Sequence, residues 1–219
     1  MVISTSNLLS VSNLSCARGD RVLFSGANFS VGSGEALYVT GANGTGKTSF
    51  LRLVCGLAAP EFGDVLWNGE SVRTLREEFA RDLLFLGHAA ALKDELSAVE
   101  NLIVSAAVAG SEISETQARH ALRTVGLRGR EFLPAKVLSA GQRRKVNLAR
   151  LHLPSPPALW VLDEPFTALD VDAISLLAET VVKHLQSGGM LIYTTHQDVK
   201  FEGCLVRRAT ISAAGVTIC

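Results

Sequence analysis

The residues whose types and spacing most clearly indicate a chemical role lie between Gly41 and Thr48, in the sequence Gly-Ala-Asn-Gly-Thr-Gly-Lys-Thr. An apolar segment that ends at Val39 precedes this octapeptide, and a helical pattern with Phe50 and Leu51 follows it. A strand, a glycine-rich turn with the spacing G-x-x-x-x-G-K-[ST] and a helix together predict a phosphate-binding loop. Glycines allow the positive φ angles that aim several backbone N–H groups at one anion. The sequence therefore predicts a site for a nucleoside triphosphate.

The residues of this phosphate loop have separable roles. Lys47 supplies a mobile cation for the β- and γ-phosphates, and Thr48 supplies a hydroxyl for Mg²⁺. The helix that begins near Lys47 adds unpaired N–H groups and the positive end of its dipole. A glycine-rich turn that merely starts a helix is the alternative interpretation. The residues predicted to contact the nucleotide are Gly41, Ala42, Asn43, Gly44, Thr45, Gly46, Lys47, Thr48 and Ser49.

Two acids, Asp163 and Glu164, follow the apolar run from Ala158 to Leu162. In a phosphate-loop protein such a strand end lies beside the loop, so Asp163 is expected to hold Mg²⁺ opposite Thr48, usually through water. Glu164 is expected to orient or deprotonate the attacking water. A strand that ends in a polar turn is the alternative. Coupled to the phosphate loop, the pair predicts Mg²⁺-dependent hydrolysis of the bound triphosphate.

Strands are expected around these motifs. Residues from about Leu8 to Val39 alternate between apolar and polar, which predicts short antiparallel strands. Residues 61–70 predict another strand pair, with Asn68 and Gly69 as its turn. The apolar runs at residues 83–86 and 158–162 predict strands that are buried on both faces.

Helices are expected between and after the strands. Capping boxes begin at Ser97 and Ser114, and Ser139 caps a third helix. Residues 89–137 are therefore interpreted as a helical insertion. The remaining expected elements are a helix over residues 171–186, a strand over residues 190–195 and an edge hairpin over residues 204–218. Strands that alternate with helices predict an α/β fold with a largely parallel sheet.

The composition fits one soluble α/β domain. The chain has 219 residues, of which 47% are hydrophobic and 19% charged, and its formal net charge is zero. This charge gives no indication of a nucleic-acid partner, and the short basic run Arg143–Lys145 is consistent with a solvated helix face.

The location of the chain is expected to be cytoplasmic. No apolar run approaches the roughly 18 residues of a membrane span. Val2 and Ile3 are followed at once by polar residues, which makes no signal-peptide core. The cysteines are far apart, which predicts free thiols in a reducing compartment. They are Cys16, Cys55, Cys204 and Cys219.

The pentapeptide Leu138–Gln142 lies ahead of the acidic pair and reads Leu-Ser-Ala-Gly-Gln. A serine at a helix N-terminus can provide a second anion site, although a capped helix alone is the alternative. Together with the phosphate loop, this pattern resembles the nucleotide-binding subunits of ATP-binding-cassette (ABC) proteins, whose hallmark is an L-S-G-G-Q signature. Ala140 departs from that signature. The resemblance extends over nearly the whole chain in the family's order.

The resemblance implies further site residues and a homodimer. Thr167–Asp170 looks like the family's D-loop, and His196 ends a strand as the family's switch histidine does, where it contacts the γ-phosphate. Two cassettes would sandwich two ATP molecules, each between the phosphate loop of one subunit and the signature of the other. ATP would drive closure, and hydrolysis would permit reopening. The nucleotide-binding residues that the resemblance adds are Ser139, Ala140, Gly141, Gln142 and Asp170.

The implied fold is an α/β P-loop NTPase of the ABC type, with residues 1–219 forming one nucleotide-binding domain. A mainly parallel sheet core would carry an N-terminal antiparallel β subdomain and a helical subdomain. The expected bounds are about 1–37 for the β subdomain, about 36–88 and 153–219 for the RecA-like core, and about 89–152 for the helical subdomain.

Two positions depart from the common family pattern. His88 aligns with a glutamine that senses Mg²⁺ and the attacking water, and its protonation would therefore matter. Arg18 aligns with the aromatic residue that stacks on adenine; a guanidinium can also stack, but Arg18 as a plain turn residue remains an alternative.

Within the family, the chain resembles the haem-exporter subunits of cytochrome c biogenesis. The residues that carry this likeness are Phe24–Gly26, Leu84–His88, Leu138–Arg144 and Asp163–Asp170. The resemblance implies a peripheral subunit at the cytoplasmic face of the inner membrane, bound to integral membrane subunits of the exporter. Direct haem binding is not expected, since the five histidines form no haem-ligand motif.

Two other functions remain open from the sequence. The chain could serve a transporter for another substrate, such as a small peptide or lipid, with the segment from His88 to Asn101 meeting the membrane partner. A soluble, non-transport ABC protein that acts on DNA or ribosomes is the third hypothesis. Such proteins usually carry two cassettes or long coiled-coil insertions and basic surfaces, which this chain lacks.

Overall fold

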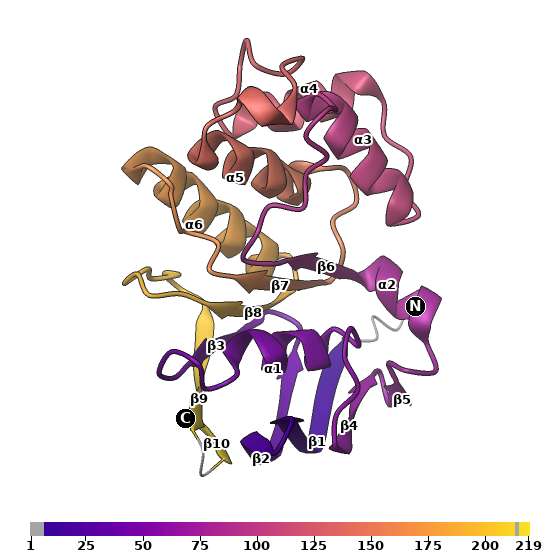
Figure 1. Cartoon of the computed structure of the whole chain (residues 1–219), viewed down its shortest axis with the longest axis vertical. Helices are drawn as coiled ribbons and strands as arrows, with labels where there is room; N and C mark the ends of the chain where they lie inside the picture. Colours follow the sequence, from indigo (N-terminus) through magenta and orange to yellow (C-terminus); the bar gives the residue numbers. More distant parts are fainter. Residues whose placement is uncertain (1–6, 213–214) are drawn as a thin grey trace. The chain divides into compact units, whose positions relative to one another are not determined.

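The computed structural model describes residues 7–212 and 215–219. The segment with Val2 and Ile3, whose pattern makes no signal-peptide core, lies outside these residues. The chain divides into two compact units, which are described separately below and can be followed by colour in Figure 1. Unit 1 consists of Met1–Phe85, Pro157–Glu164 and Val181–Cys219, and unit 2 consists of Leu86–Pro156 and Pro165–Thr180.

An antiparallel sheet in unit 1 has the strand order β2-β1-β4-β5. Its strands are β1 (Leu8–Arg18), β2 (Arg21–Gly32), β4 (Phe62–Trp67) and β5 (Glu70–Ser71). The predicted turn between β4 and β5 is confirmed: Asn68 and Gly69 have φ angles of 53° and 91°. Two consecutive positive φ angles suit Asn-Gly. The expected β subdomain of residues 1–37 omits β4 and β5, although β4 pairs with β1.

A second sheet has the order β10-β9-β3-β8-β7-β6 and confirms the mainly parallel core (Figure 1). Its strands are β3 (Glu35–Thr40), β6 (Leu83–Leu86), β7 (Leu159–Asp163), β8 (Met190–Thr194), β9 (Leu205–Ser212) and β10 (Gly215–Ile218). β3 pairs in parallel with β8 and β9, and β7 pairs in parallel with β8. β9 and β10 form the expected antiparallel hairpin at one edge.

Burial of the strands follows their place in this sheet. Every residue of β7 is buried, as its uninterrupted apolar run predicts, and every residue of β8 is buried as well. The same prediction is wrong for β6, because Leu83 and Phe85 are only half-buried at the sheet's other edge. An apolar run therefore identifies a strand here without determining whether both of its faces are covered.

Two helices complete the first part of unit 1: α1 (Lys47–Val54) and the short α2 (Arg76–Asp82), which the sequence did not predict. α1 buries Phe50, Leu51, Leu53 and Val54. They join one core cluster with residues of the sheets, among them Leu37, Val161 and Ile192. The start of α1, and with it the phosphate loop, is thereby fixed against the strand ends.

Unit 2 is built from helices. They are α3 (Ala98–Val108), α4 (Glu115–Thr124), α5 (Ala140–Leu148) and the first part of α6 (Val171–Gln186), whose last part belongs to unit 1. The predicted capping boxes at Ser97 and Ser114 are confirmed. In the part of the chain that the structure describes, no helix is both long and apolar enough to cross a membrane.

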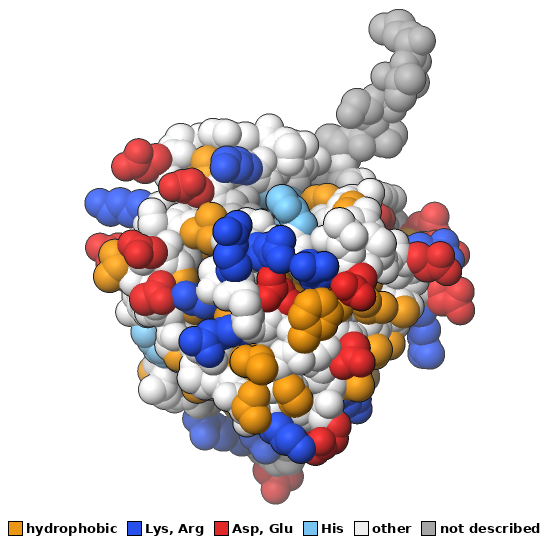
Figure 2. All heavy atoms as spheres, turned by 90° about the horizontal axis from the view of Figure 1, so that it is seen from above, with side chains coloured by type: hydrophobic (Ala, Val, Ile, Leu, Met, Phe, Trp, Pro, Cys, Tyr) orange, Lys and Arg blue, Asp and Glu red, His pale blue; other side chains and the backbone are white. Residues whose placement is uncertain are grey.

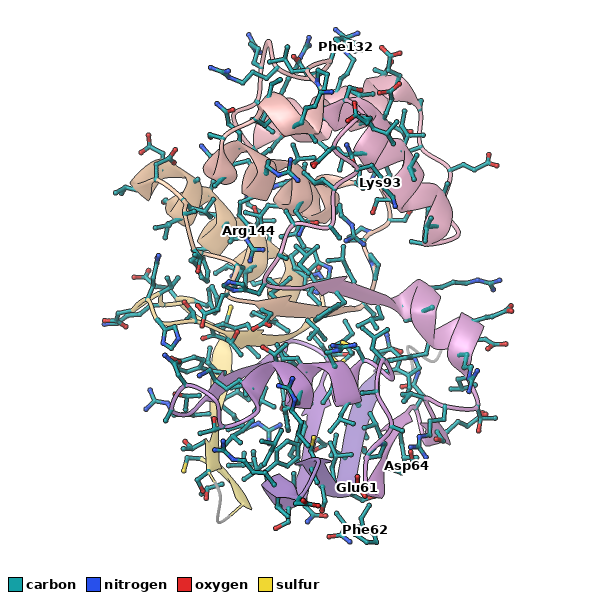
Figure 3. All side chains as sticks on the ribbon, viewed as in Figure 1. Glu61, Phe62, Asp64, Lys93, Phe132 and Arg144 are labelled. Carbon is teal, nitrogen blue, oxygen red and sulfur yellow. The ribbon has the colours of Figure 1, made fainter. Side chains whose placement is uncertain are left out.

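Charged side chains of both signs are mixed with scattered hydrophobic ones on the face shown in Figure 2. Several large hydrophobic residues of unit 2 are exposed, including Val104, Val108 and Val137. Phe132, which Figure 3 labels, is also exposed, and Arg119 lies over its ring. Single exposed apolar side chains of this kind are ordinary on soluble proteins.

Candidate functional site

The phosphate loop joins the end of β3 to the start of α1. Gly41, Gly44 and Gly46 have φ angles of 149°, 78° and 102°, a region that L-residues rarely adopt. Gly41 is also sterically restricted, because a Cβ there would lie 2.5 Å from the carbonyl oxygen of Ile211. Gly46 is the N-cap of α1 and provides no side-chain cap, so the first-turn amides of the helix remain available to an anion.

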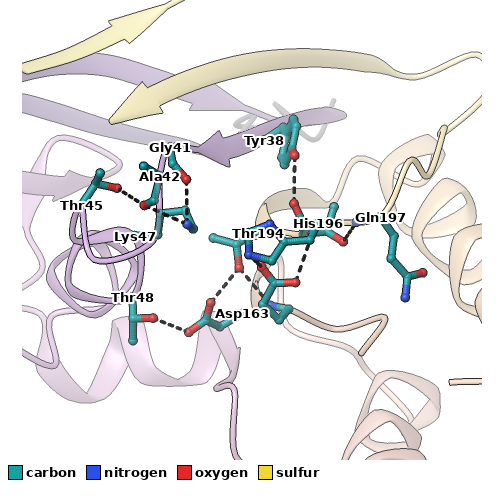
Figure 4. A network of polar contacts seen from close by, with 12 residues as sticks. Tyr38, Gly41, Ala42, Thr45, Lys47, Thr48, Asp163, Thr194, His196 and Gln197 are labelled. Carbon is teal, nitrogen blue, oxygen red and sulfur yellow. Dashed lines mark hydrogen bonds and ion pairs between the residues drawn. The ribbon is translucent and has the colours of Figure 1, made fainter. Parts of the chain in front are cut away.

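The Lys47 ammonium lies inside the loop. Its Nζ donates to the carbonyl oxygens of Gly41 at 2.8 Å and Ala42 at 3.3 Å, as the dashed lines in Figure 4 show. No carboxylate forms an ion pair with Lys47 among the described residues. The loop therefore presents an uncompensated positive charge together with unpaired helix amides, a donor set that fits a polyphosphate.

Asp163 is held by two threonines. Thr48 Oγ1 donates to Asp163 Oδ2 at 2.9 Å, and Thr194 Oγ1 donates to Oδ1 at 2.7 Å (Figure 4). Asp163 is only 3% exposed, so its carboxylate depends on these contacts for its orientation. A hydroxyl and a carboxylate oxygen are hard ligands of the kind that Mg²⁺ prefers. Among the described residues no group of three or more acidic, His or Cys side chains is arranged to hold a metal ion, so the remaining ligands would come from phosphate and water.

Glu164 and His196 meet at the ends of two neighbouring strands. The parallel register pairs Asp163 of β7 with Thr194 of β8, so Glu164, one residue after β7, lies near His196, two residues after β8. The Glu164 carboxylate accepts a hydrogen bond from His196 N at 3.2 Å, and its Oε1 lies 3.3 Å from His196 Nε2. The Glu164 side chain is 12% exposed and that of His196 63% exposed. A shielded carboxylate therefore lies beside an accessible imidazole.

Thr194 is a site residue for which sequence reasoning gave no role. Besides holding Asp163, its Oγ1 accepts a hydrogen bond from Glu164 N at 2.9 Å. Glu164 has a φ of 52°, unusual for a residue other than glycine, and this bond fixes that conformation. The only sequence signal was a hydroxyl at the end of a buried strand.

Arg18 lies in unit 1 at the end of β1 and is exposed. It pairs with Arg21 across the turn of the β1–β2 hairpin. No aromatic ring lies under its guanidinium among the described residues, so the surface of this side chain is accessible to a ligand. Its stacking on adenine stays a prediction.

The signature residues begin α5 in unit 2. Ser139 and Gln142 form a capping box: Ser139 Oγ accepts from Gln142 N at 3.3 Å, and Gln142 Oε1 accepts from Ser139 N at 3.0 Å. Ala140 is exposed, so there is room for its methyl group where the family signature has glycine. Gly141 does not have that room, because a Cβ there would lie 2.9 Å from the carbonyl oxygen of Ala168.

Asp170 ties the segment after β7 to α5. Its Oδ2 lies 2.7 Å from Lys145 Nζ, and its Oδ1 accepts from Ala173 N at 2.8 Å. The hydrogen bond from Lys145, followed by that from Ala173, holds the pKa of Asp170 below its usual value. The predicted D-loop is thus anchored to the helix that carries the signature.

The basic run Arg143–Lys145 is not a solvated helix face. Arg144, labelled in Figure 3, is only 5% exposed. It donates to the carbonyl oxygens of Gly87 at 2.9 Å and His88 at 3.3 Å. Its Nε also donates to the carbonyl of Pro165 at 3.4 Å. Arg144 therefore fixes the backbone of His88, whose side chain is exposed. A run of three basic residues carries no signal that its middle member is buried.

Comparison with known proteins agrees with this geometry. A family model described as "ABC transporter" matches residues 24–167. The cytochrome c biogenesis ATP-binding export protein CcmA of Nitrosospira multiformis is 48% identical over 200 residues, covering 91% of this chain and 97% of that protein.

Solved structures share the fold. An ATP-binding subunit of an ABC transporter has a TM-score of 0.84 and 26% identity, covering 97% of this chain and 89% of that one. The cassette MJ0796, described as a dimeric post-hydrolysis state bound to ADP and Pi, has a TM-score of 0.81 and 20% identity, covering 96% of this chain and 97% of that one.

Proposed function

The chain belongs to the ABC transporter family, and from this premise we propose that it is the ATP-hydrolysing subunit of an ABC membrane complex for cytochrome c biogenesis. The observation that carries the proposal is the 48% identity over 91% of the chain to a CcmA protein, whose name describes an ATP-binding export protein of cytochrome c biogenesis. The complex would support haem export or delivery, including the release of a haem-loaded chaperone.

The nucleotide site would work through the charges of the phosphate loop and the acids that follow β7. Lys47 would neutralise the β- and γ-phosphates, while the loop amides donate to their oxygens. Thr48 and Asp163 would hold Mg²⁺, which stabilises negative charge on the phosphates. Glu164 would accept a proton from the attacking water, and its contact with His196 Nε2 at 3.3 Å would keep the imidazole at the γ-phosphate.

A second copy of the chain would complete the nucleotide site. Each ATP would lie between the phosphate loop of one copy and Ser139–Gln142 of the other. The name of one structural relative describes a dimer with bound ADP and Pi, which supports this arrangement. The exposed side chain of His88, on a backbone that Arg144 holds, supports the proposal that His88 senses Mg²⁺ and water. The exposed Arg18 is proposed to stack on adenine.

The partners proposed for the chain are integral membrane subunits, CcmB-like and CcmC-like. The chain would bind them at the cytoplasmic face of the inner membrane as a peripheral subunit. The word "export" in the name of the relative supports a membrane complex. The segment from His88 to Asn101 is the proposed contact with these subunits.

A haem stain for covalent c-type cytochromes tests the proposal in a deletion strain. The strain is complemented with the wild-type chain, with Lys47→Ala and with Glu164→Gln, at matched protein levels. We expect c-type haem to disappear on deletion and to return only with the wild type, because maturation then needs ATP turnover. Survival of c-type haem in the deletion strain would overturn the cytochrome c assignment and favour a transporter for another substrate.

A further inference from the structure

Three side chains form a row across the mainly parallel sheet of unit 1, next to the strand that leads to His196. The strand order places β3 between β9 and β8. The two parallel registers pair Tyr38 of β3 with Arg208 of β9 on one side and with Tyr193 of β8 on the other. Paired residues of neighbouring strands point to the same face of a sheet, so these three side chains are neighbours in the order Arg208, Tyr38, Tyr193.

The Tyr38 ring is packed between its two neighbours. Tyr193 stacks on it with centroids 5.1 Å apart and planes 20° apart. The Arg208 guanidinium lies 5.5 Å from the ring centroid, within the range of a cation–π contact. Tyr193 is itself buried, and Phe201 meets it edge to face with centroids 5.3 Å apart. Packing therefore restrains the position of the Tyr38 hydroxyl, and a hydrogen bond from this hydroxyl costs little additional side-chain entropy.

The Tyr38 hydroxyl bonds the peptide group that joins Thr195 to His196. It donates to the carbonyl oxygen of Thr195 at 2.9 Å, along a dashed line in Figure 4. The N–H of the same peptide group donates to Glu164 Oε2 at 3.2 Å. Because a peptide group is planar, a bond that holds its carbonyl also fixes the direction of its N–H. One peptide group therefore connects Tyr38 to the proposed base.

The Thr195 carbonyl depends on Tyr38 for this orientation. Thr195 is only 6% exposed, and its hydroxyl is engaged elsewhere, accepting from Gln197 N at 3.0 Å. A shielded carbonyl that loses its donor pays the cost of an unmet hydrogen bond, which it can avoid by turning toward water. Such a turn would take the N–H of His196 away from Glu164. A carbonyl that accepts a hydrogen bond also polarises its peptide group and strengthens the bond that the N–H donates.

We propose that Tyr38 is a positioning residue for ATP hydrolysis. It orients the peptide group between Thr195 and His196, and this peptide group directs the Glu164 carboxylate toward the attacking water. Tyr38 acts through the backbone and needs no contact with nucleotide or water. Its role in hydrolysis rests on the proposed function, in which Glu164 is the base, whereas its hold on the peptide group does not.

Tyr38→Phe tests the role in hydrolysis, because it removes the hydroxyl and leaves a ring between Arg208 and Tyr193. We expect kcat for ATP hydrolysis to fall roughly tenfold, since the base is less well oriented. KM for ATP should stay within about twofold, since Lys47 and the loop amides keep their phosphate contacts. Steady-state hydrolysis at increasing ATP measures both constants. An unchanged kcat, or a higher KM with unchanged kcat, would overturn the proposal.

Thr180→Val is the matched control, because it removes another hydroxyl that donates to a backbone carbonyl. Thr180 Oγ1 donates to the carbonyl oxygen of Leu176 at 2.7 Å within α6, away from the acids that follow β7. This variant should keep the kcat and KM of the wild type. A loss of kcat equal to that of Tyr38→Phe would show that any missing bond of this kind slows the chain, and would refute a positioning role.

Amide hydrogen exchange in the nucleotide-free full-length chain tests the hold on the peptide group. We expect the His196 N–H to exchange roughly tenfold faster in Tyr38→Phe than in the wild type, as measured by NMR. Thr180→Val should exchange this proton at the wild-type rate. Equal exchange in Tyr38→Phe and the wild type would overturn the proposal. Faster exchange together with a wild type that hydrolyses no ATP would confirm the hold and count against the proposed function alone.

Discussion

At the scale of single residues, one hydroxyl connects the proposed metal ligand to the proposed base. Thr194 Oγ1 donates to Asp163 Oδ1 at 2.7 Å and accepts from Glu164 N at 2.9 Å. The first bond leaves Asp163 Oδ2 turned to Thr48, 2.9 Å away. The second bond holds the unusual φ of 52° at Glu164. Loss of a group that orients a metal ligand in this way typically costs roughly tenfold to a hundredfold in metal affinity or activity.

Thr194→Val tests this connection, because valine keeps the shape of the side chain and removes both bonds. We expect ATP turnover to fall roughly tenfold to a hundredfold and the Mg²⁺ requirement to rise. Steady-state hydrolysis at increasing Mg²⁺ measures both effects. Thr195→Val is the matched control, since Thr195 Oγ1 only accepts from Gln197 N. Equal turnover in the two variants would refute the role of Thr194.

Glu164→Gln tests the proposed base without changing its size. An amide cannot take a proton from water, so turnover should fall roughly a hundredfold or more. ATP affinity should stay close to that of the wild type, because Lys47 and the loop amides provide it. Lys47→Ala should show the converse, a large loss of ATP affinity, which a fluorescent nucleotide titration measures. Wild-type turnover in Glu164→Gln would rule out this residue as the base.

At the scale of elements, the start of α5 is fitted closely to the segment after β7. A Cβ at Gly141 would lie only 2.9 Å from the carbonyl oxygen of Ala168, whereas the neighbouring Ala140 is exposed. Lys145 adds an ion pair with Asp170 one turn further along the helix. The helix and the predicted D-loop therefore move as one piece inside unit 2.

Gly141→Ala should disturb this piece although alanine favours helices. The backbone carbonyl of Ala168 cannot give way without moving the predicted D-loop, so we expect a free energy of unfolding lower by about 1–3 kcal/mol. Urea denaturation measures it. Ala140→Gly, one residue away, should cost only about 1 kcal/mol or less from helix propensity. A larger loss in Ala140→Gly than in Gly141→Ala would contradict the close fit.

At the scale of the whole molecule, a buried histidine makes stability depend on pH. His184 is 7% exposed and stacks on Trp160, with ring centroids 3.7 Å apart. Burial lowers the pKa of His184 from 6.5 to about 4, against the hydrogen bond to Met190. In the folded chain the imidazole is therefore neutral at neutral pH. Between pH 6.5 and about 4 the unfolded chain binds a proton that the folded chain does not.

The free energy of unfolding should consequently fall by about 3 kcal/mol through His184 as the pH drops across this window. Its contribution is fully present above pH 6.5 and is lost as the pH approaches about 4. Urea denaturation at several pH values measures this loss as the difference between the wild type and His184→Phe in how steeply the free energy of unfolding changes with pH. His184→Phe keeps a ring on Trp160. The exposed His120 provides the control, His120→Gln, which should keep the wild-type slope. Parallel slopes for the wild type and His184→Phe would contradict the assignment.

The proposed dimer is also a property of the whole molecule. Glu164→Gln with Mg²⁺ and ATP should elute as a dimer, because slow hydrolysis traps the closed state. With ADP it should elute as a monomer. The double variant Lys47→Ala/Glu164→Gln should stay monomeric with either nucleotide. Light scattering on the eluting peak measures the mass, and a dimer without nucleotide would refute ATP-driven closure.

Several local features of the structure could be predicted from the sequence alone. The glycine-rich loop before α1, the helix caps at Ser97, Ser114 and Ser139 and the Asn68-Gly69 turn depend on residues a few positions apart, and each is found where the sequence predicted it. Uninterrupted apolar runs likewise located β7 and β8. Such features can be predicted because their stabilising contacts lie within one short segment.

Tertiary structure alone decided the contacts between distant segments. Thr48 and Asp163 are 115 residues apart and meet only because of the order of the strands. The two bonds of Thr194 and the burial of Arg144 have the same origin. A side chain's type does not specify which strand or helix will lie against it. For this protein the sequence determined which residues could do chemistry, and the packing of the sheets and helices determined which of them meet.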